Sequence, residues 1–248
     1  MNKWITGKVI KVNKWTSNLF SIILHASITP FTAGQFAKLS FKEAIEIKRA
    51  YSYVNPPHDK NLEFYIVLIP KGKMTFRLYN LKYNDEILIT KQASGFFTIE
   101  EIPICRDLWM FATGTAIGPF LSILQEKNNK IKEFKNIILI HAVRYTKELN
   151  YGDRIKQIKE NYNGKLHTHT IVSRENSKDS LMGRIPYLII NKELENKVGF
   201  QINTNVSHIM LCGNPNMVRD TNKVLLENKN MRKNYRRNPG HITCENYW

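Results

Sequence analysis

The distribution of hydrophobic residues changes character near residue 100 of this 248-residue chain. Up to about Thr98, short runs of β-forming residues are separated by glycine, proline and asparagine. Beyond that point, longer apolar runs alternate with helix-like segments. Short punctuated runs are typical of antiparallel sheets, whereas continuous apolar runs between helices are typical of parallel α/β sheets. The pattern therefore predicts two domains, residues 1–100 and residues 101–248.

The first half predicts an antiparallel barrel or sandwich. Its β-forming runs lie at residues 9–12, 19–24, 50–54, 62–68 and 86–89. Many short strands with regular turns between them favour a closed or layered antiparallel sheet. We expect one helix in this half, at about residues 74–81.

The second half predicts a parallel sheet covered by helices. We expect strands at residues 108–112, 137–143, 166–172 and 209–212, and helices at about 117–126, 153–161, 185–195 and 215–228. Asn214 followed by Pro215 is typical of a helix start, because asparagine caps the first turn and proline fits within it. Strands and helices that alternate in this way indicate an α/β domain.

The loops after these strands carry candidate phosphate ligands, since ligands of a parallel sheet gather at the carboxyl ends of its strands. The segment 113–119 follows the first strand, and its glycines and the next helix suit a phosphate. It lacks the G-x-G-x-x-G spacing, so a tight strand–helix turn explains it equally well. Cys212 opens the loop after the fourth strand, where a lone cysteine more often fills a core than acts as a functional thiol.

Arginines follow two successive strands of the second half. Arg144 follows the second strand, Ser173 and Arg174 follow the third, and Arg184 comes ten residues after Arg174. Any one of them is readily explained as a solvated surface charge. Together they favour a clamp for a 2′-phosphate, because a guanidinium binds phosphate through two parallel hydrogen bonds.

Two segments of the first half and the end of the chain also suit a nucleotide. The run Arg49-Ala50-Tyr51-Ser52 combines a cation, a flat ring and a hydroxyl. The turn Gly72-Lys73-Met74-Thr75 opens a helix and is a second phosphate candidate. Tyr247 and Trp248 close the chain with two aromatic rings, where chain ends are usually polar. They suit stacking on a flat ligand, or packing on a neighbouring helix.

Charge and cysteine content limit the class of protein. Lys and Arg number 37 against 21 Asp and Glu, which gives a net charge of +16 and indicates an anionic partner. The 3 cysteines are far apart, which argues against disulfides, zinc and an internal iron–sulfur cluster. The first eight residues contain no apolar segment of signal-peptide length. We therefore expect a cytoplasmic protein without a metal, and we interpret the uncharged stretch 108–125 as a strand, a glycine turn and a helix.

Taken together, these segments resemble the bacterial ferredoxin/flavodoxin–NADP⁺ reductase family along essentially the whole chain. The most specific parts are residues 49–52, 112–119, 211–215 and the terminal pair 247–248. The resemblance implies an FAD-binding antiparallel β-barrel at 1–100. It also implies an NADP-binding parallel-sheet α/β domain at 101–248, whose aromatic tail returns to the FAD. One departure is Cys244, where we expect a small residue such as alanine.

The resemblance also implies a set of ligands. For FAD these are Arg49, Ala50, Tyr51, Ser52, Tyr65, Lys73, Met74, Thr75, Thr115, Tyr247 and Trp248. For NADP(H) they are Val143, Arg144, Ser173, Arg174, Arg184, Asn214, Pro215, Asn216 and Asp220. Catalytic roles fall on Ser52 near the reactive flavin nitrogen, Cys212 near the nicotinamide, Glu245 in proton relay and Tyr247 over the flavin face. Tyr247 must move aside, because the nicotinamide needs the face that it covers.

The activity implied is hydride transfer from NADPH to FAD, followed by transfer of single electrons to flavodoxin or ferredoxin. These carriers are generally acidic, so the positive charge suits them, and we expect a monomer without membrane or nucleic-acid partners. One alternative is another NADPH- or NADH-linked member of the same flavoprotein superfamily, such as a reductase component of an oxygenase. The other is a nucleic-acid-binding protein, since Arg232, Lys233, Tyr235, Arg236 and Arg237 form a basic and aromatic cluster. No nucleic-acid motif accompanies that cluster.

Overall fold

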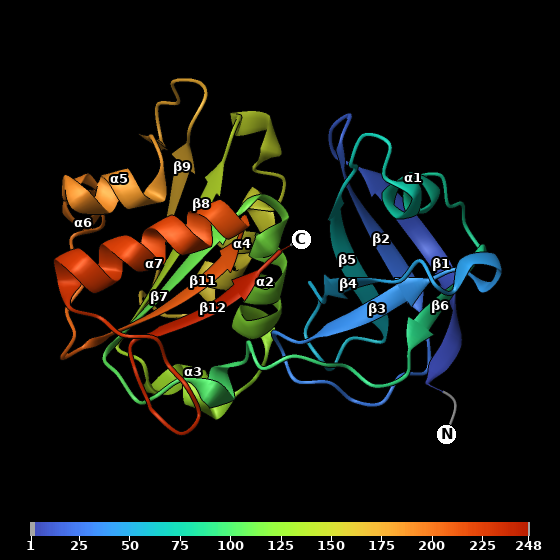
Figure 1. The fold of residues 1–248 in the computed structure, drawn as a ribbon, viewed down its shortest axis with the longest axis horizontal. Helices are drawn as coiled ribbons and strands as arrows, with labels where there is room; N and C mark the ends of the chain where they lie inside the picture. The colour runs from blue at the N-terminus through green and yellow to red at the C-terminus, as the bar shows by residue number, and fades with distance from the viewer. Residues whose placement is uncertain (1–2, 248) are drawn as a thin grey trace. The chain divides into compact units, whose positions relative to one another are not determined.

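The computed structural model describes residues 3–247, and they form two compact units (Figure 1). The first unit contains the residues up to Thr98 and the segment Gly118–Glu126, and the second contains Ile99–Ile117 and the chain from Lys127 onward. The chain therefore passes from one unit to the other three times. This division differs from two domains that meet at residue 100, because a later segment returns to the first unit.

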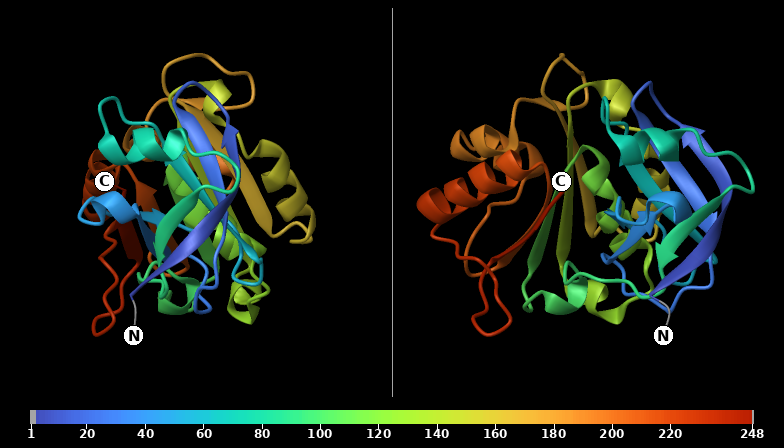
Figure 2. Two further views of the ribbon diagram at one scale, coloured as in Figure 1. Left: turned by 90° about the vertical axis from the view of Figure 1, so that its right-hand side faces the viewer. Right: turned by 45° about the vertical axis from the view of Figure 1, so that its right-hand side comes forward.

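The first unit is built around an antiparallel sheet that curves around its own core (Figure 2). Its strands are β1 Trp4–Lys14, β2 Leu19–His25, β3 Phe36–Ser40, β4 Arg49–Ser52, β5 Asn61–Val67 and β6 Glu86–Thr90. They are ordered β4-β3-β6-β1-β2-β5. An isolated bridge joins Tyr53, which follows edge strand β4, to Phe64 of the other edge strand, β5. The sheet is therefore a nearly closed barrel, and the expected barrel is confirmed.

One strand of the barrel was not predicted. The sequence of β3, Phe-Ala-Lys-Leu-Ser, contains an alanine and a lysine, both of which are poor strand formers. It becomes a strand because β4 and β6 pair with it from both sides. The expected helix is α1, at Lys73–Tyr79.

Helix α2, at Ile117–Gln125, packs on the first unit. The Ser122 hydroxyl donates to the Asn55 carbonyl at 2.7 Å, and Phe120 meets Phe97 edge to face. These long-range contacts explain why the helix groups with the barrel although the strand before it belongs to the second unit. The uncharged stretch 108–125 is thus a strand, a turn and a helix, as expected. Within residues 3–247, no helix has both the length and the apolar character that a membrane crossing needs.

The second unit is a parallel six-stranded sheet in the order β10-β9-β8-β7-β11-β12. Its strands are β7 Asp107–Thr113, β8 Asn136–Val143, β9 Leu166–Val172, β10 Leu181–Met182, β11 Ser207–Gly213 and β12 Ile242–Asn246. The chain leaves β7 toward β8 on one side and later returns to pair β11 on the other. The strand order therefore reverses at β7, and the predicted parallel sheet is confirmed.

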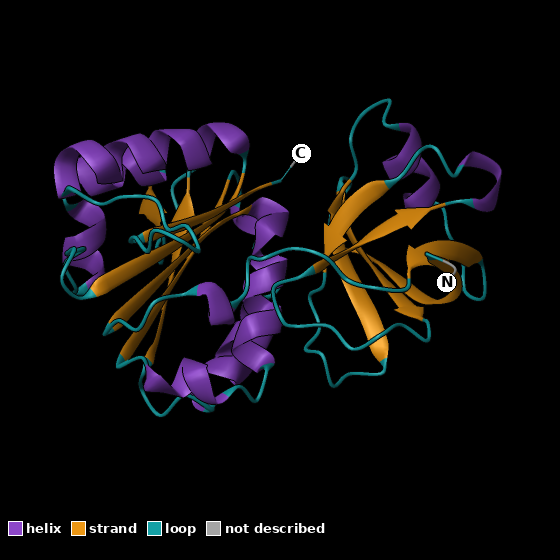
Figure 3. Ribbon diagram, turned by 60° about the horizontal axis from the view of Figure 1, so that its bottom comes forward, coloured by secondary structure: helices purple, strands orange, loops and turns teal. Residues whose placement is uncertain are grey.

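Helices lie on both faces of this sheet (Figure 3). They are α3 Asn129–Glu133, α4 Gly152–Glu160, α5 Ile185–Ile190, α6 Glu193–Val198 and α7 Pro215–Lys229. The one helix predicted at 185–195 is two, because Lys192 takes a left-handed backbone with φ 62° between them. Strand β12, of sequence Ile-Thr-Cys-Glu-Asn, was not predicted, because only one strong β-former stands in it beside polar residues and it pairs with distant β11.

A buried ion pair joins α6 to the end of α7. Lys229 Nζ lies 2.6 Å from Glu195 Oε2, and the two side chains are 17 % and 5 % exposed. The other carboxylate oxygen of Glu195 accepts from the Ile202 backbone N–H at 2.7 Å. The carboxylate thus fixes both the end of α7 and the segment that enters β11, and it depends on Lys229 for its charge balance.

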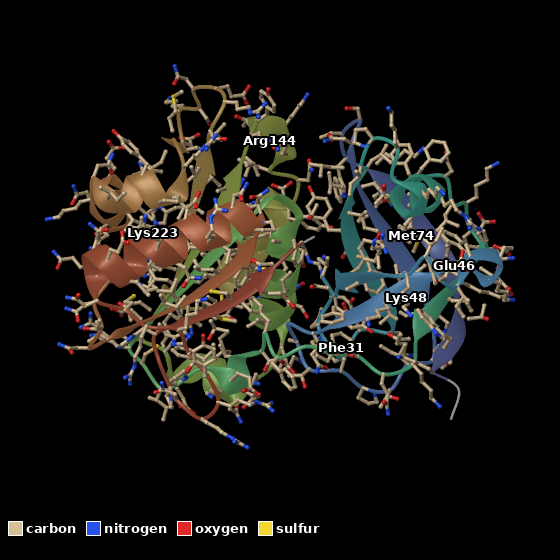
Figure 4. The ribbon with its side chains drawn as sticks, viewed as in Figure 1. Phe31, Glu46, Lys48, Met74, Arg144 and Lys223 are labelled. Atoms are coloured by element: carbon tan, nitrogen blue, oxygen red, sulfur yellow. The ribbon has the colours of Figure 1, made fainter. Side chains whose placement is uncertain are left out.

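Replacing Lys229 by methionine is expected to lower the free energy of unfolding by about 3 kcal/mol, because it leaves a buried carboxylate without its cation. Lys223→Met is the matched control on the same helix (Figure 4), since Lys223 is exposed and 3.9 Å from exposed Glu227. The control is expected to cost no more than about 0.5 kcal/mol. Urea unfolding followed by circular dichroism measures both, and equal losses would contradict the role given to the pair.

Candidate functional site

The carboxyl ends of β7 and β11 meet closely where the strand order reverses. Gly213 ends β11 with φ 141°, and a Cβ there would lie 2.0 Å from Thr113 Oγ1 at the end of β7. The same hydroxyl oxygen accepts from the Asn214 backbone N–H at 2.9 Å. Such a reversal point is where open α/β sheets bind ligands. Only glycine at position 213 permits this approach.

Helix α7 begins at the same edge. The Asn214 side chain accepts from the Asn216 backbone N–H at 2.9 Å and caps the helix, and Pro215 occupies its first turn. Asn216 is exposed, as is Asp220 one turn later, which accepts from Arg219. The structure therefore brings these four predicted ligands to the start of one helix. The Asn214 side-chain oxygen is already used there, because it accepts the hydrogen bonds that cap the helix.

Arg144, Ser173, Arg174 and Arg184 form what we call the arginine corner. The Arg174 backbone N–H donates to the Arg144 carbonyl at 3.0 Å, and that of Ser173 donates to the Val143 carbonyl at 3.1 Å. Strand β10 pairs with the end of β9, and Arg184 follows it after Gly183 and precedes α5. The three guanidinium side chains are exposed, and Arg144 lies at the end of β8 (Figure 4).

Two carboxylates that the sequence analysis missed support the arginine corner. Glu148 accepts from the Arg144 backbone N–H at 2.8 Å, and Glu175 accepts from the Thr146 backbone N–H at 2.6 Å. The hydrogen bonds from Thr146 lower the pKa of Glu175. Glu148 fixes the turn after β8 from within, whereas Glu175 ties that turn to the turn after β9. No local sequence signal marks Glu175, because its bond spans 29 residues.

The glycine turn after β7 is a 3-10 turn at Gly114–Ala116. Gly114 has a left-handed φ of 55°, which glycine adopts without strain. Thr115, a predicted ligand, is only 4 % exposed. His141 of β8 reaches the Gly114 carbonyl with Nε2 at 3.0 Å, and burial lowers the pKa of His141 to about 4.

The predicted ligands of the first unit lie on β4 and β5. Arg49 and Ala50 are exposed, Tyr51 is half-buried against the barrel core, and Ser52 is buried beside Phe36 of β3. Burial raises the pKa of Tyr51. Arg49 donates to the Lys48 carbonyl at 2.9 Å. This strand thus presents an exposed cation, a partly covered ring and a buried hydroxyl in succession.

Two further parts of the first unit were predicted as ligands. Tyr65 lies on β5 and is buried. At the start of α1, Lys73 is exposed and Met74 packs into the barrel core. The Thr75 hydroxyl accepts from Ile69 N–H at 3.1 Å and donates to the Gly72 carbonyl. Thr75 therefore uses its hydroxyl to close its own turn, and a ligand there would meet chiefly the main chain and Lys73.

The ends of β11 and β12 bring the remaining predicted residues together. Cys212 and Glu245 are partners in the parallel register, and burial raises the pKa of both side chains, that of Glu245 to about 7. Glu245 Oε2 is buried without a hydrogen-bond partner among residues 3–247. The Tyr247 backbone N–H donates to the Gly213 carbonyl at 2.8 Å. Trp248 lies outside the described residues, and Cys244 accepts from the Asn222 amide at 2.9 Å.

Comparison with known proteins gives full-length relatives. Residues 110–223 match the oxidoreductase NAD-binding domain family. The chain is 56 % identical to the flavodoxin/ferredoxin–NADP reductase of Buchnera aphidicola subsp. Baizongia pistaciae and 51 % identical to that of Escherichia coli strain K12, each over 100 % of both chains. A ferredoxin NADP⁺ reductase from Neisseria gonorrhoeae, solved with bound FAD and NADP, superposes with a TM-score of 0.92 at 34 % identity over 99 % of both chains.

Glu245 is expected to make the stability of the ligand-free chain depend on pH. Its folded pKa of about 7 lies above its ordinary value of 4.5, so folding favours the protonated form. Stability from this group is complete below about pH 4.5 and is lost as the pH rises to about 7, a change of about 3 kcal/mol. Glu245→Gln should therefore match the unchanged chain near pH 4.5 and exceed it at pH 8, as measured by urea unfolding.

The control for this prediction is Glu160→Gln, since Glu160 is exposed at the end of α4. It should follow the unchanged chain at every pH. A constant offset of Glu245→Gln across the whole range would show that Glu245 keeps an ordinary pKa.

Proposed function

The chain belongs to the flavodoxin/ferredoxin–NADP reductase family, and we propose from this that it oxidises NADPH and delivers electrons to flavodoxin or ferredoxin. Bound FAD supplies the chemistry, since a flavin accepts a hydride and releases electrons singly. The observation that carries the proposal is the edge of the parallel sheet, where the arginine corner, the glycine turn and the start of α7 converge. The residues of the chain then have to bind the two cofactors, orient them and exclude water from the reacting atoms.

We assign NADP(H) to the second unit. A 2′-phosphate suits the arginine corner, because three exposed guanidinium groups follow adjacent strand ends. Glu148 holds the Arg144 backbone N–H, and Glu175 holds the Thr146 N–H in the same turn. Val143 provides the carbonyl that anchors Ser173. The groove would continue past Asn214, Pro215 and Asn216 to Asp220. Cys212 is a neutral, buried side chain at the end of β11, which fits packing near a nicotinamide and not attack as a thiolate.

We assign FAD to the barrel of the first unit. Exposed Arg49 suits a pyrophosphate, Tyr51 suits a flat ring, and the buried Ser52 hydroxyl suits one hydrogen bond to it. Lys73 and the main chain of α1 suit phosphate. The roles of Ala50, Tyr65, Thr115 and Tyr247 toward FAD stay predictions, as does that of Trp248. Glu245 fits proton relay, because its pKa of about 7 allows it to gain and lose a proton near neutrality.

The partner we propose is an acidic flavodoxin or ferredoxin, attracted by the net charge of +16. We further propose that the chain acts as a monomer in the cytoplasm, without membrane or nucleic-acid partners. The basic cluster after α7 is the feature that suggested nucleic acid as an alternative partner. One of its cations, Arg236, forms an ion pair with Glu101 of the same unit, which reduces the charge that the cluster offers to a phosphate backbone.

Replacing any arginine of the arginine corner by alanine is expected to raise KM for NADPH by about 10- to 100-fold, because a charged hydrogen-bonded contact contributes about 1.5–3 kcal/mol. KM for NADH, which lacks the 2′-phosphate, should change little. Arg77→Ala is the control, since Arg77 lies on α1 and pairs with Glu43. Ferricyanide reduction measures both KM values, and an equal rise for NADPH and NADH would contradict a 2′-phosphate clamp.

Reduction of an acidic carrier is expected to slow at least about tenfold as ionic strength rises from about 0.01 M to about 1 M, because salt screens the attraction that brings the proteins together. Flavin content should stay constant over the same range. Stopped-flow mixing of NADPH-reduced enzyme with flavodoxin or ferredoxin gives the rate, and the visible spectrum gives the flavin content. A rate that does not respond to salt would exclude charge steering.

A further inference from the structure

His141 lies within β8, where it is 3 % exposed and pairs in register with Ala112 of β7. Its imidazole Nε2 lies 3.0 Å from the Gly114 carbonyl oxygen. A carbonyl only accepts, so Nε2 carries the proton and donates it.

The turn that His141 contacts is held from both neighbouring strands. On one side, the Gly114 carbonyl accepts from His141 of β8 and from the Ile117 backbone N–H. On the other side, Thr113 Oγ1 accepts from the Asn214 N–H that follows β11. A Cβ at Gly114 would meet nothing within 4 Å, so close packing at that position does not explain the left-handed turn. The hydrogen bonds from His141, Ile117 and Asn214 are the contacts that hold it.

We propose that His141 is a positioning residue for hydride transfer, which fixes the Thr113–Ala116 turn through the Gly114 carbonyl. The proposal rests on the function proposed above. The turn stands at the point of the sheet where the strand order reverses, so displacing it shifts whatever binds there. Hydride transfer depends on the separation of two rings, and a misplacement of about 1 Å costs about 100-fold in rate.

The chemistry of a histidine suits this task. Burial lowers the pKa of His141 to about 4, so the ring is neutral at physiological pH and adds no charge beside a cofactor. A neutral ring with its proton on Nε2 is a rigid donor with one orientation. A serine or threonine on β8 would be too short to span from the strand to the turn.

Two carboxamides test the proposal, because they differ only in reach. Glutamine places its amide nitrogen as many bonds from Cβ as Nε2 of histidine, whereas asparagine falls one bond short. In the FAD-loaded full chain, His141→Asn should slow anaerobic flavin bleaching by saturating NADPH at least about tenfold. His141→Gln should stay within about threefold of the unchanged enzyme. Binding of adenosine 2′,5′-bisphosphate, which carries the 2′-phosphate assigned to the arginine corner and has no nicotinamide, should be the same in both variants as in the unchanged enzyme.

His208→Asn is the control for simple loss of stability. His208 is likewise buried, at 2 % exposure, but it lies early in β11 and contacts Thr243 at 2.9 Å. It should lower the melting temperature as His141→Asn does without slowing bleaching. The proposal is overturned if His141→Asn bleaches at the normal rate, or if His141→Gln is as slow as His141→Asn. If NADPH fails to bleach the unchanged holoenzyme, the proposed function itself is wrong.

Discussion

The second unit depends on the approach of two backbones at the carboxyl ends of β7 and β11. Gly213 lies so close to Thr113 that a single Cβ would meet the threonine hydroxyl at 2.0 Å. This contact brings the Asn214 N–H onto Thr113 and sets the direction in which α7 begins. Parallel pairing then places the ends of β8 and β9 along the same edge. Every predicted NADP ligand lies on a segment that this edge positions.

In the second unit, the exposed arginines and the carboxylates beside them have different tasks. The exposed cations of the arginine corner are available to a ligand, while the nearby carboxylates of Glu148 and Glu175 are committed to backbone N–H groups. Hydrogen bonds from backbone N–H groups hold a carboxylate in place and favour its charged form. Both carboxylates therefore serve to hold the backbone beside the three arginines. In the buried pair of Glu195 and Lys229, by contrast, a carboxylate and a cation contact each other directly, and the pair stabilises the fold.

Local sequence predicted most elements because their residues favour the same state that tertiary packing stabilises. Strands β7, β8 and β11 are nearly continuous apolar runs, and such runs are buried on both faces. Strands β3 and β12 were missed for a common reason. Strand β3 and strand β12 have sequences of low strand propensity, and each is formed by partners distant in the chain. The helix expected at 185–195 is interrupted by a left-handed lysine that no propensity indicates.

The sequence by itself determined the two kinds of sheet, the family resemblance, the surplus of positive charge and the arginines that follow successive strands. These are properties of composition and spacing, which short windows of the chain carry. Only the tertiary structure decided that α2 packs on the barrel, that Glu175 braces the arginine corner, and that His141 holds the Gly114 carbonyl. Each of these depends on hydrogen bonds whose direction is fixed by strand register and backbone geometry. Their formation requires the folded chain, because the partners meet only after the sheets have been assembled.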